Sequence, residues 1–365
     1  MQLNSLSLSH LRNLHAIQLE LNPQLNIFWG ENGGGKTSLL EAVHVLGTGR
    51  SFRASQSRQI ITFGQGVCRV SGVVSSHNPE TLASPVRLGV ERALSGTIKM
   101  RVGEQDCHSI ATLAQTLPLQ LINSESYDLL EASPQLRRQF LDWALFHVEH
   151  SFYPTWQRFK RVLEQRNAAI KAMNANTAGI RAWDKELIET GEEIDSARRA
   201  ILQELSPIFS ETLKSLLSLT KETVVQYSSG WGEEDSLAQA IEKSLERDRA
   251  WGYTTMGPQR ADLEFLIGKV PAKNLLSRGQ LKLFICSLLM ARAILLYRRQ
   301  GRRCVFLVDD LNSELDHKAS ERLIEALLNL GGQVLVTSID SAHLTKVLRG
   351  KEYSLFQVEA GNIFS

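Results

Sequence analysis

The chain has 365 residues, 43% of them hydrophobic and 22% charged, which is ordinary for a globular protein and long enough for two domains. Its 41 basic and 39 acidic residues give a formal net charge of +2, so composition by itself makes no case for a nucleic-acid ligand. The four cysteines form no CxxC pair, and the sequence has no signal-peptide pattern and no apolar run of about 18 residues, so we expect a cytoplasmic protein with no membrane partner.

The N-terminal part of the chain has the pattern of an α/β domain. Alternating polar and apolar residues at its start predict two short antiparallel strands. Residues 25–29 have the pattern of a buried strand and lead into a glycine-rich loop, and residues 38–46 predict a helix that Gly47 is placed to end. Residues 60–110 are rich in Val, Thr, Ser and Gly and predict further short strands.

The middle of the chain, residues 124–250, has a different character. Strand signals are few there, and long helical patterns cover residues 135–146, 153–173, 183–219 and 236–249. Pro207 falls inside the third pattern and predicts a kink or a break. Heptads are not sustained, which excludes a long coiled coil. We expect a helical domain in this part of the chain.

The α/β pattern resumes in the last part of the chain. It predicts an apolar helix, a buried strand, an amphipathic helix and a second buried strand, over residues 281–297, 304–308, 318–330 and 333–337. Strand, helix and strand in this order form a parallel βαβ unit. We therefore expect one α/β domain made of residues 1–123 and 251–365, with residues 124–250 inserted as a helical domain.

The strongest chemical signal is the run GENGGGKT at residues 30–37, which fits the P-loop template in spacing and in context. Glycines let the backbone wrap a triphosphate, and the N-terminus of the next helix adds a positive dipole. Lys36 would place its charge on the β- and γ-phosphates, and the Thr37 hydroxyl would bind Mg²⁺. A chance match in a glycine-rich turn is the alternative. The predicted ATP contacts here are Gly30, Glu31, Asn32, Gly33, Gly34, Gly35, Lys36, Thr37 and Ser38.

A second signal is the buried strand at 305–308, which ends in Asp309 and Asp310. P-loop enzymes hold Mg²⁺ with an acid at the end of such a strand, so Asp309 is predicted to bind the metal together with Thr37. Asp310 would position or deprotonate the attacking water. The alternative is a strand that ends in a solvated acidic turn. Lys36, Asp309 and Asp310 are the predicted catalytic residues, with ATP and Mg²⁺ as cofactors.

A third motif is LSRGQ at residues 276–280, just ahead of the apolar helix, and it resembles the LSGGQ signature of ABC and SMC ATPases. Residues 313–316 (SELD) resemble their D-loop. A loop at a helix start presents a hydroxyl and free N–H groups to an anion. The alternative is that Ser277 is only the N-cap of a core helix, and both can hold at once. The predicted ATP contacts of this motif are Ser277, Arg278, Gly279 and Gln280.

Together with the P-loop, these motifs are most similar to those of the RecF family of bacterial recombination mediators. The resemblance spans most of the chain and includes the runs GRSFR at 49–53, RRQFLDW at 137–143 and QRN at 165–167. It implies an ABC/SMC-like P-loop ATPase head with an inserted helical second domain. It also implies an ATP-dependent homodimer, in which Ser277 and Gly279 of one subunit touch the γ-phosphate held by Lys36 of the other.

The function implied by the resemblance is a recombination mediator that binds single- and double-stranded DNA at gaps or junctions and helps to load the recombinase. RecR- and RecO-like proteins are the implied partners. DNA repair, replication and the SOS response are the implied processes. Two alternatives stay open, a regulatory ATP-binding adaptor with negligible turnover and an ABC transporter ATPase subunit. An SMC-type tether would need coiled-coil arms for which the chain has no room.

Three positions bear on how the ATPase would work. Asp310 stands where ABC ATPases usually carry Glu, which indicates slow hydrolysis and a switch rather than a motor. Thr337 or Ser338 stands where many of them carry a switch His, and Thr337 is the predicted contact; a hydroxyl can reach the γ-phosphate but cannot carry positive charge. Gln120 is a candidate for the Q-loop, and an ordinary polar residue at a strand end is an equal alternative.

Two weaker features have ordinary explanations. His147 and His150 could form half a metal site, but they lack the HExxH spacing and a third ligand, so we expect structural roles. Clustered basic residues could follow a phosphate backbone, or they could form a solvated face balanced by Glu164, Glu192 and Glu193. The basic residues concerned are Arg50, Arg53, Arg137, Arg138, Arg158, Lys160, Arg161, Arg166, Arg198 and Arg199.

Overall fold

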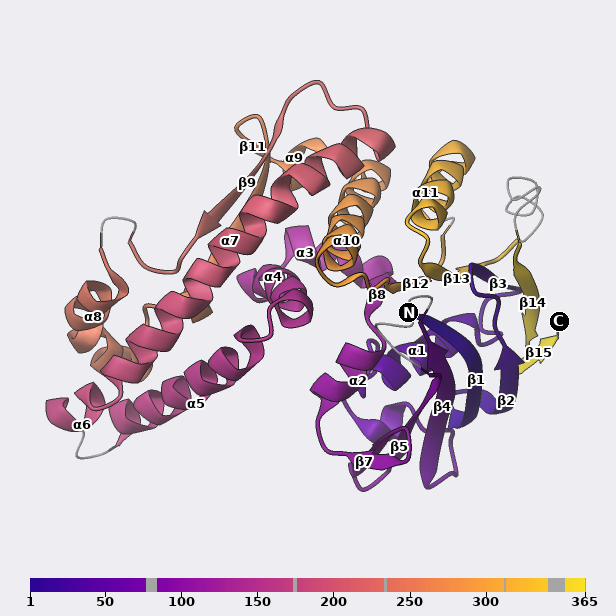
Figure 1. Cartoon of the computed structure of the whole chain (residues 1–365), viewed down its shortest axis with the longest axis horizontal. Coiled ribbons are helices and arrows are strands. Elements are labelled where there is room, and N and C mark those ends of the chain that lie inside the picture. The colour runs from indigo at the N-terminus through magenta and orange to yellow at the C-terminus, as the bar shows by residue number, and fades with distance from the viewer. Residues whose placement is uncertain (77–83, 173–175, 233–234, 312, 341–351, 365) are drawn as a thin grey trace. The chain divides into compact units, whose positions relative to one another are not determined.

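The computed structural model describes residues 1–365 apart from 77–83, 173–175, 233–234, 312, 341–351 and 365 (Figure 1). The chain divides into two compact units. An α/β unit comprises Met1–Ser126 and Arg278–Ser365, and a helical unit comprises Tyr127–Ser277. The predicted inserted segment ended at residue 250, whereas the helical unit continues to Ser277, because strand β10 pairs with strand β9 inside this unit.

The α/β unit contains two six-stranded sheets among its described residues. The first sheet is antiparallel, in the order β2-β1-β4-β5-β6-β7, with strands Leu14–Glu20, Gln2–Leu11, Val67–Ser75, Val86–Ala93, Ile98–Val102 and Gln105–Cys107. The second sheet has the order β15-β14-β3-β13-β12-β8, with strands Asn362–Phe364, Ser354–Glu359, Leu25–Trp29, Gln333–Ser338, Val305–Val308 and Leu119–Ile122.

Strands β14, β3, β13, β12 and β8 of the second sheet run parallel, so their carboxyl ends lie at one edge. The predicted βαβ unit is present, with helix α11 (His317–Asn329) between β12 and β13. The other α-helices among the described residues of this unit are α1 (Lys36–Thr48), α2 (Ile110–Thr116) and α10 (Arg278–Gln300). Helix α10 has the length and hydropathy of a membrane span, but 78% of that window is buried, as in a core helix.

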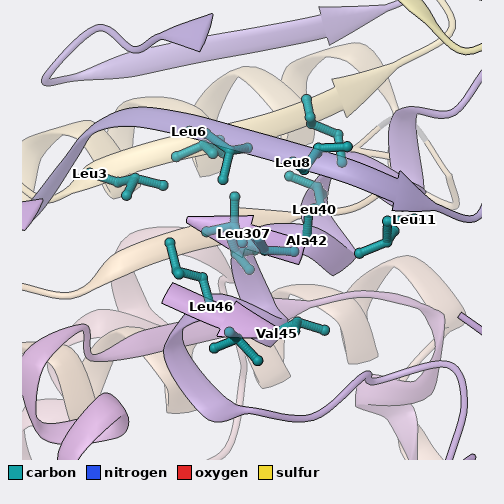
Figure 2. Packing of buried hydrophobic residues seen from close by; sticks show 14 of the residues in the cluster. Leu3, Leu6, Leu8, Leu11, Leu40, Ala42, Val45, Leu46 and Leu307 are labelled. Atoms are coloured by element: carbon teal, nitrogen blue, oxygen red, sulfur yellow. The ribbon is translucent and has the colours of Figure 1, made fainter. Parts of the chain in front are cut away.

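The core of the α/β unit is built around α1, which packs against strands of both sheets. Figure 2 shows this packing, with residues of α1, β1 and β12 gathered in one cluster: Leu40, Ala42, Val45 and Leu46; Leu3, Leu6, Leu8 and Leu11; and Leu307. A helix that is apolar on nearly all sides belongs inside a core. The packing fixes the N-terminus of α1, and therefore the end of the P-loop, in a rigid frame.

The helical unit contains α3 (Asp128–Glu131), α4 (Pro134–Val148), α5 (Phe152–Lys171), α6 (Thr177–Arg181), α7 (Asp184–Leu216), α8 (Leu237–Trp251) and α9 (Ala272–Leu275). Its sheet has the order β11-β10-β9, with strands Val270–Pro271, Asp262–Ile267 and Thr223–Ser228, and it is antiparallel. Helix α7 packs along α4, α5 and α8 (Figure 1). It continues through Pro207, so the chain does not break there. The predicted end of the second helical pattern, Met173, lies outside the described residues.

Candidate functional site

The P-loop joins the buried strand β3 to α1, and the C-terminal hairpin of β14 and β15 packs against it. The carbonyl oxygen of Val358 lies very close to the loop. A Cβ atom added to Gly30 would be 2.3 Å from this oxygen, and one added to Gly34 would be 2.8 Å from it. The N–H of Gly361 donates to the carbonyl of Gly34 at 2.9 Å. Gly30 and Gly34 are therefore required by this backbone packing as well as by the approach of a phosphate. Nothing in the neighbouring sequence indicates the packing.

Lys36 is the first residue of α1 and is only 8% exposed. Its ammonium group donates to the carbonyl oxygens of Gly30 at 2.6 Å and Glu31 at 2.8 Å, so the side chain folds back over the loop. Burial lowers the pKa of Lys36, and the carboxylates of Asp310 and Asp309 act in the opposite direction. An ammonium group has three donors and the two carbonyls accept from two of them, so Lys36 can still donate to an anion such as a phosphate.

The end of β12 places its two acids beside the start of α1. The hydroxyl of Thr37 donates to Oδ1 of Asp309 at 3.0 Å, and the hydroxyl of Thr337 in β13 donates to the same oxygen at 2.8 Å. The backbone N–H of Asp310 donates to the Thr337 hydroxyl oxygen at 2.8 Å. Parallel strands bring these residues together, because β12 pairs with β13 and β13 pairs with β3. A hydroxyl and a carboxylate that meet in this way are hard oxygen donors of the kind Mg²⁺ prefers.

A cavity of about 510 Å³ opens over this edge of the sheet. Of the predicted residues, Asn32, Gly33, Gly35, Lys36, Thr37, Ser38, Asp309, Asp310 and Thr337 line it. Gly30, Glu31 and Gly34 do not line it, because they form the base of the loop against β14 and Lys36. Arg12, Asn13, Arg53 and Ile339 line it without having been predicted as contacts.

Arg12 and Arg53 are held at this cavity by Glu41, a fully buried residue of α1. Arg12 donates to both carboxylate oxygens of Glu41, at 2.8 and 2.9 Å, and Arg53 lies 3.8 Å from it. The Ser51 hydroxyl also donates to Glu41. The GRSFR run therefore wraps around a buried carboxylate that orients two guanidinium groups. The apolar pattern of α1 contains one acidic residue, and that is the signal that could have found this network.

The predicted signature residues of the α/β unit, Arg278, Gly279 and Gln280, do not line the cavity. Helix α10 begins at Arg278, and Ser277 is the last residue of the helical unit. A Cβ atom on Gly279 would lie 2.7 Å from the carbonyl oxygen of Glu314, so the signature backbone packs against the predicted D-loop of its own chain. Asp316 ends that loop as the N-cap of α11, accepting from the N–H of Ala319 at 2.7 Å.

The structure buries two of the weaker candidates, Gln120 and His147. Gln120 is fully buried in β8, where its side-chain oxygen accepts a hydrogen bond from Arg292, and it does not line the cavity. This placement favours the ordinary polar residue over the Q-loop. His147 is 4% exposed and its ring packs on Trp143 and Phe146, and no group of three metal-ligating side chains occurs among the described residues.

Several of the predicted basic residues form ion pairs inside the helical unit. Arg166 is fully buried, and it lies 2.7 Å from both Asp184 and Asp248. Arg198 is 3% exposed and donates to both oxygens of Asp142, at 2.8 and 2.9 Å. These arginines hold α4, α5, α7 and α8 together, and their burial keeps both guanidinium groups away from a DNA backbone.

Other basic residues of the same unit lie at its surface. Arg158 pairs with Glu186 at 3.3 Å, and Lys160 lies 3.9 Å from Glu164, with all four side chains well exposed. Exposed pairs of this kind contribute little stability. The charges of Arg158 and Lys160 are therefore accessible, which is compatible with both a solvated face and a DNA contact.

Comparison with known proteins finds a matching family and similar proteins over the whole chain. Residues 2–363 match the family described as RecF/RecN/SMC N terminal domain. A DNA replication and repair protein RecF of Stutzerimonas stutzeri (strain A1501) is 45% identical over 364 residues, which cover 100% of this chain and 97% of that protein. A protein of the same description from Pseudomonas aeruginosa (strain LESB58) is 43% identical over 364 residues, with the same coverage.

Solved structures show the same fold. A structure of the recombination mediator protein RecF with ATP, in the RecFOR pathway, matches with a TM-score of 0.87 at 22% identity and covers 100% of this chain and 97% of that one. An Smc head bound to the C-winged helix domain of ScpA matches with a TM-score of 0.61 at 13% identity, with the same coverage. The predicted fold, an ABC/SMC-like ATPase head with an inserted helical domain, is confirmed.

Proposed function

This chain belongs to the RecF/RecN/SMC N-terminal domain family and, within it, to the RecF proteins, and on that premise we propose that it is an ATP-dependent, DNA-binding recombination mediator. It dimerises on ATP, binds single- and double-stranded DNA at gaps and junctions, and helps to load the recombinase. RecO- and RecR-like proteins are its partners, and it serves DNA repair, replication and the SOS response. The observation that carries the proposal is the meeting of Lys36, Thr37, Asp309 and Thr337 around one cavity.

The residues of this cavity fit ATP and Mg²⁺. The glycine backbone and the Lys36 ammonium would hold the triphosphate, and the oxygens of Thr37 and Asp309, 3.0 Å apart, would hold the metal. When bound, Mg²⁺ neutralises charge on the phosphate oxygens. Asp310 would position the attacking water, and Thr337 would keep both acids in place. Arg12 and Arg53 would add positive charge at the mouth of the same cavity.

The cavity lining does not include Arg278, Gly279 and Gln280 of the same unit, which supports a site shared between two chains. Ser277, Arg278, Gly279 and Gln280 would complete the cavity of the partner, so that ATP joins the two subunits. Hydrolysis at the shared site would then release the DNA clamp.

Slow turnover is part of the proposal. Asp310 is one methylene shorter than the Glu usual at this position, and its backbone has φ 50°, a left-handed conformation uncommon for residues other than glycine. The shorter side chain favours hydrolysis as a timer, and it keeps a regulatory adaptor with negligible turnover as the second candidate. The similarity to RecF proteins over the whole length leaves the transporter alternative without support.

Sedimentation tests the proposal directly. The wild type, Lys36→Arg and Ser277→Arg are compared with Mg²⁺, first without nucleotide, then with ATP, and finally with a gapped DNA duplex. We expect ATP to drive dimer formation and DNA retention in the wild type and in neither variant. A wild type that stays monomeric with ATP and binds DNA equally without it would refute the ATP-dependent clamp and favour the adaptor.

A further inference from the structure

Lys282 lies on α10 just after the predicted signature and is only 5% exposed. Its ammonium group donates to three backbone carbonyl oxygens of the segment that follows β12: Asp310 at 3.1 Å, Leu311 at 3.5 Å and Ser313 at 2.7 Å. An ammonium group has three donors and no acceptor, so the three carbonyls match its full capacity. One side chain of the signature helix thus contacts both the predicted water-positioning acid and the start of the D-loop.

The segment that Lys282 holds is strained. Asp310 has φ 50° and Glu314 has φ 67°, both in the left-handed region. Such conformations persist only where the surroundings impose them. Asp310 is restrained from two sides, since its N–H donates to Thr337 and its carbonyl accepts from Lys282. The position of the Asp310 carboxylate therefore depends on where α10 holds Lys282.

The signature itself makes a second contact with the same segment. The backbone of Gly279 approaches the carbonyl of Glu314 so closely that a Cβ atom would come within 2.7 Å of the oxygen. Gly279 and Lys282 are three residues apart on a helix, so they share one face. A shift of the first turn of α10 must therefore move the D-loop and Asp310 with it.

Packing alone does not explain a lysine at this position. Burial lowers the pKa of Lys282, while Cys286, Asp310, Glu314 and Asp309 act in the opposite direction. Among the described residues, no carboxylate forms a salt bridge with it within 4.0 Å. An apolar side chain of similar length would fill the space without the cost of desolvating a charge. The ammonium group is therefore explained by the three carbonyls that it positions.

We propose that Lys282 is a positioning residue that couples the two nucleotide sites of the dimer. When the signature of one subunit closes on the ATP of its partner, α10 moves Lys282, and Lys282 sets Asp310 in the site of its own subunit. This rests on the proposed ATP dimer, because only there does the signature meet a nucleotide. Each site then hydrolyses ATP fast only when the other site is also closed.

Mixed dimers test the coupling at one site. The partner subunit carries Asp309→Asn, which by the proposed roles binds ATP and does not hydrolyse it, and it is added in saturating excess. All turnover then comes from the cavity of the test subunit, which is completed by the intact signature of the partner. The test subunits are the wild type, Ser277→Arg, Lys282→Met, the double variant and Lys282→Arg. Arg298→Met, an equal loss of charge at the exposed far end of α10, is the matched control.

We expect Ser277→Arg and Lys282→Met each to lower turnover at the test subunit's own site, by about 10- to 100-fold for a small misplacement of the acid. The double variant should lose no more turnover than either single variant, because both substitutions interrupt the same coupling from the signature to Asp310. Lys282→Arg should keep most of the turnover, and Arg298→Met all of it. Binding of a fluorescently labelled ATP to each monomer should stay within about 2-fold of the wild type, since Lys282 does not line the cavity.

Three results would overturn the coupling. Losses that add in the double variant would mean that Lys282 acts independently of the signature. Unchanged turnover in Ser277→Arg at its own site would mean that nothing passes from the signature to Asp310. Equal losses of ATP binding and turnover in both Lys282 variants would reduce Lys282 to a packing role. If the wild type itself formed no ATP-driven dimers or showed no turnover, the proposed function would be refuted instead. The wild type alone distinguishes this outcome from a failure of the coupling.

Discussion

Thr337→Val removes one hydroxyl and leaves the shape of the side chain nearly unchanged. In the structure this hydroxyl donates to Asp309 and accepts from the N–H of Asp310, both at 2.8 Å. Thr337 is itself only 1% exposed. The variant therefore frees both acids at once, and we expect it to bind ATP and to hydrolyse it poorly.

The expected loss of turnover in Thr337→Val follows from the two lost hydrogen bonds. A bond to a charged carboxylate contributes about 1.5 kcal/mol at the low end of its range. The N–H of Asp310 can find water, because Asp310 is exposed, so its loss costs about 0.5 kcal/mol. If this sum of about 2 kcal/mol acts on the transition state, turnover falls about 30-fold. The free energy of unfolding should fall by at most about 2 kcal/mol.

Single-turnover hydrolysis, nucleotide binding and urea unfolding check these numbers together. Thr337→Ser should keep both hydrogen bonds and most of the turnover. Ser338→Ala is the neighbouring control, because it removes a hydroxyl that donates to the carbonyl of Asp340. Turnover at the wild-type rate in Thr337→Val would refute the view that this hydroxyl holds the acids. A loss of ATP affinity equal to the loss of turnover would make Thr337 a nucleotide contact instead.

Three further predictions concern stability and can be read by chemical unfolding. Arg166→Met leaves the fully buried carboxylate of Asp248 without its partner and should lower the free energy of unfolding by about 3–5 kcal/mol, and a change below 1 kcal/mol would contradict the ion pair in the structure. In an ordinary helix Gly279→Ala would raise the free energy of unfolding by up to about 1 kcal/mol. Here the added Cβ atom would lie 2.7 Å from the carbonyl oxygen of Glu314, so we expect destabilisation and slower turnover. A stabilised variant would refute the contact. Burial raises the pKa of Cys286 from 9.0 to about 12, so the folded state favours the neutral thiol. The free energy of unfolding should therefore fall as the pH rises from about 9 to 12, and it should fall less steeply in Cys286→Ala.

The nucleotide cavity was predictable from sequence where its chemistry is local. The P-loop needs a strand, a glycine turn and a helix in immediate succession, and the acids need only a buried strand before them, so short windows of sequence contain both signals. The pairing of β3, β13 and β12 then brings Thr37, Asp309 and Thr337 together, and a parallel sheet makes that meeting necessary.

The rest of the cavity depends on contacts between distant parts of the chain. Arg12 reaches it through Glu41, and the P-loop glycines accommodate Val358, more than three hundred residues away. The boundary of the helical unit was misplaced for the same reason, since β10 pairs with a strand that precedes α8. Periodicity records which face of an element is buried, but it does not record which distant element covers that face.

Charge in the sequence was the least informative signal for DNA contacts, and the structure explains why. Arg166 and Arg198 have the same side chain as Arg158, yet both are enclosed with carboxylates at 2.7 and 2.8 Å, whereas Arg158 faces solvent. An arginine paired with a buried carboxylate adds no net charge to the summed field of the protein. A buried-arginine variant that loses DNA binding would therefore report unfolding of the helical unit, and the salt dependence of binding can be assigned only to exposed residues such as Arg158 and Lys160.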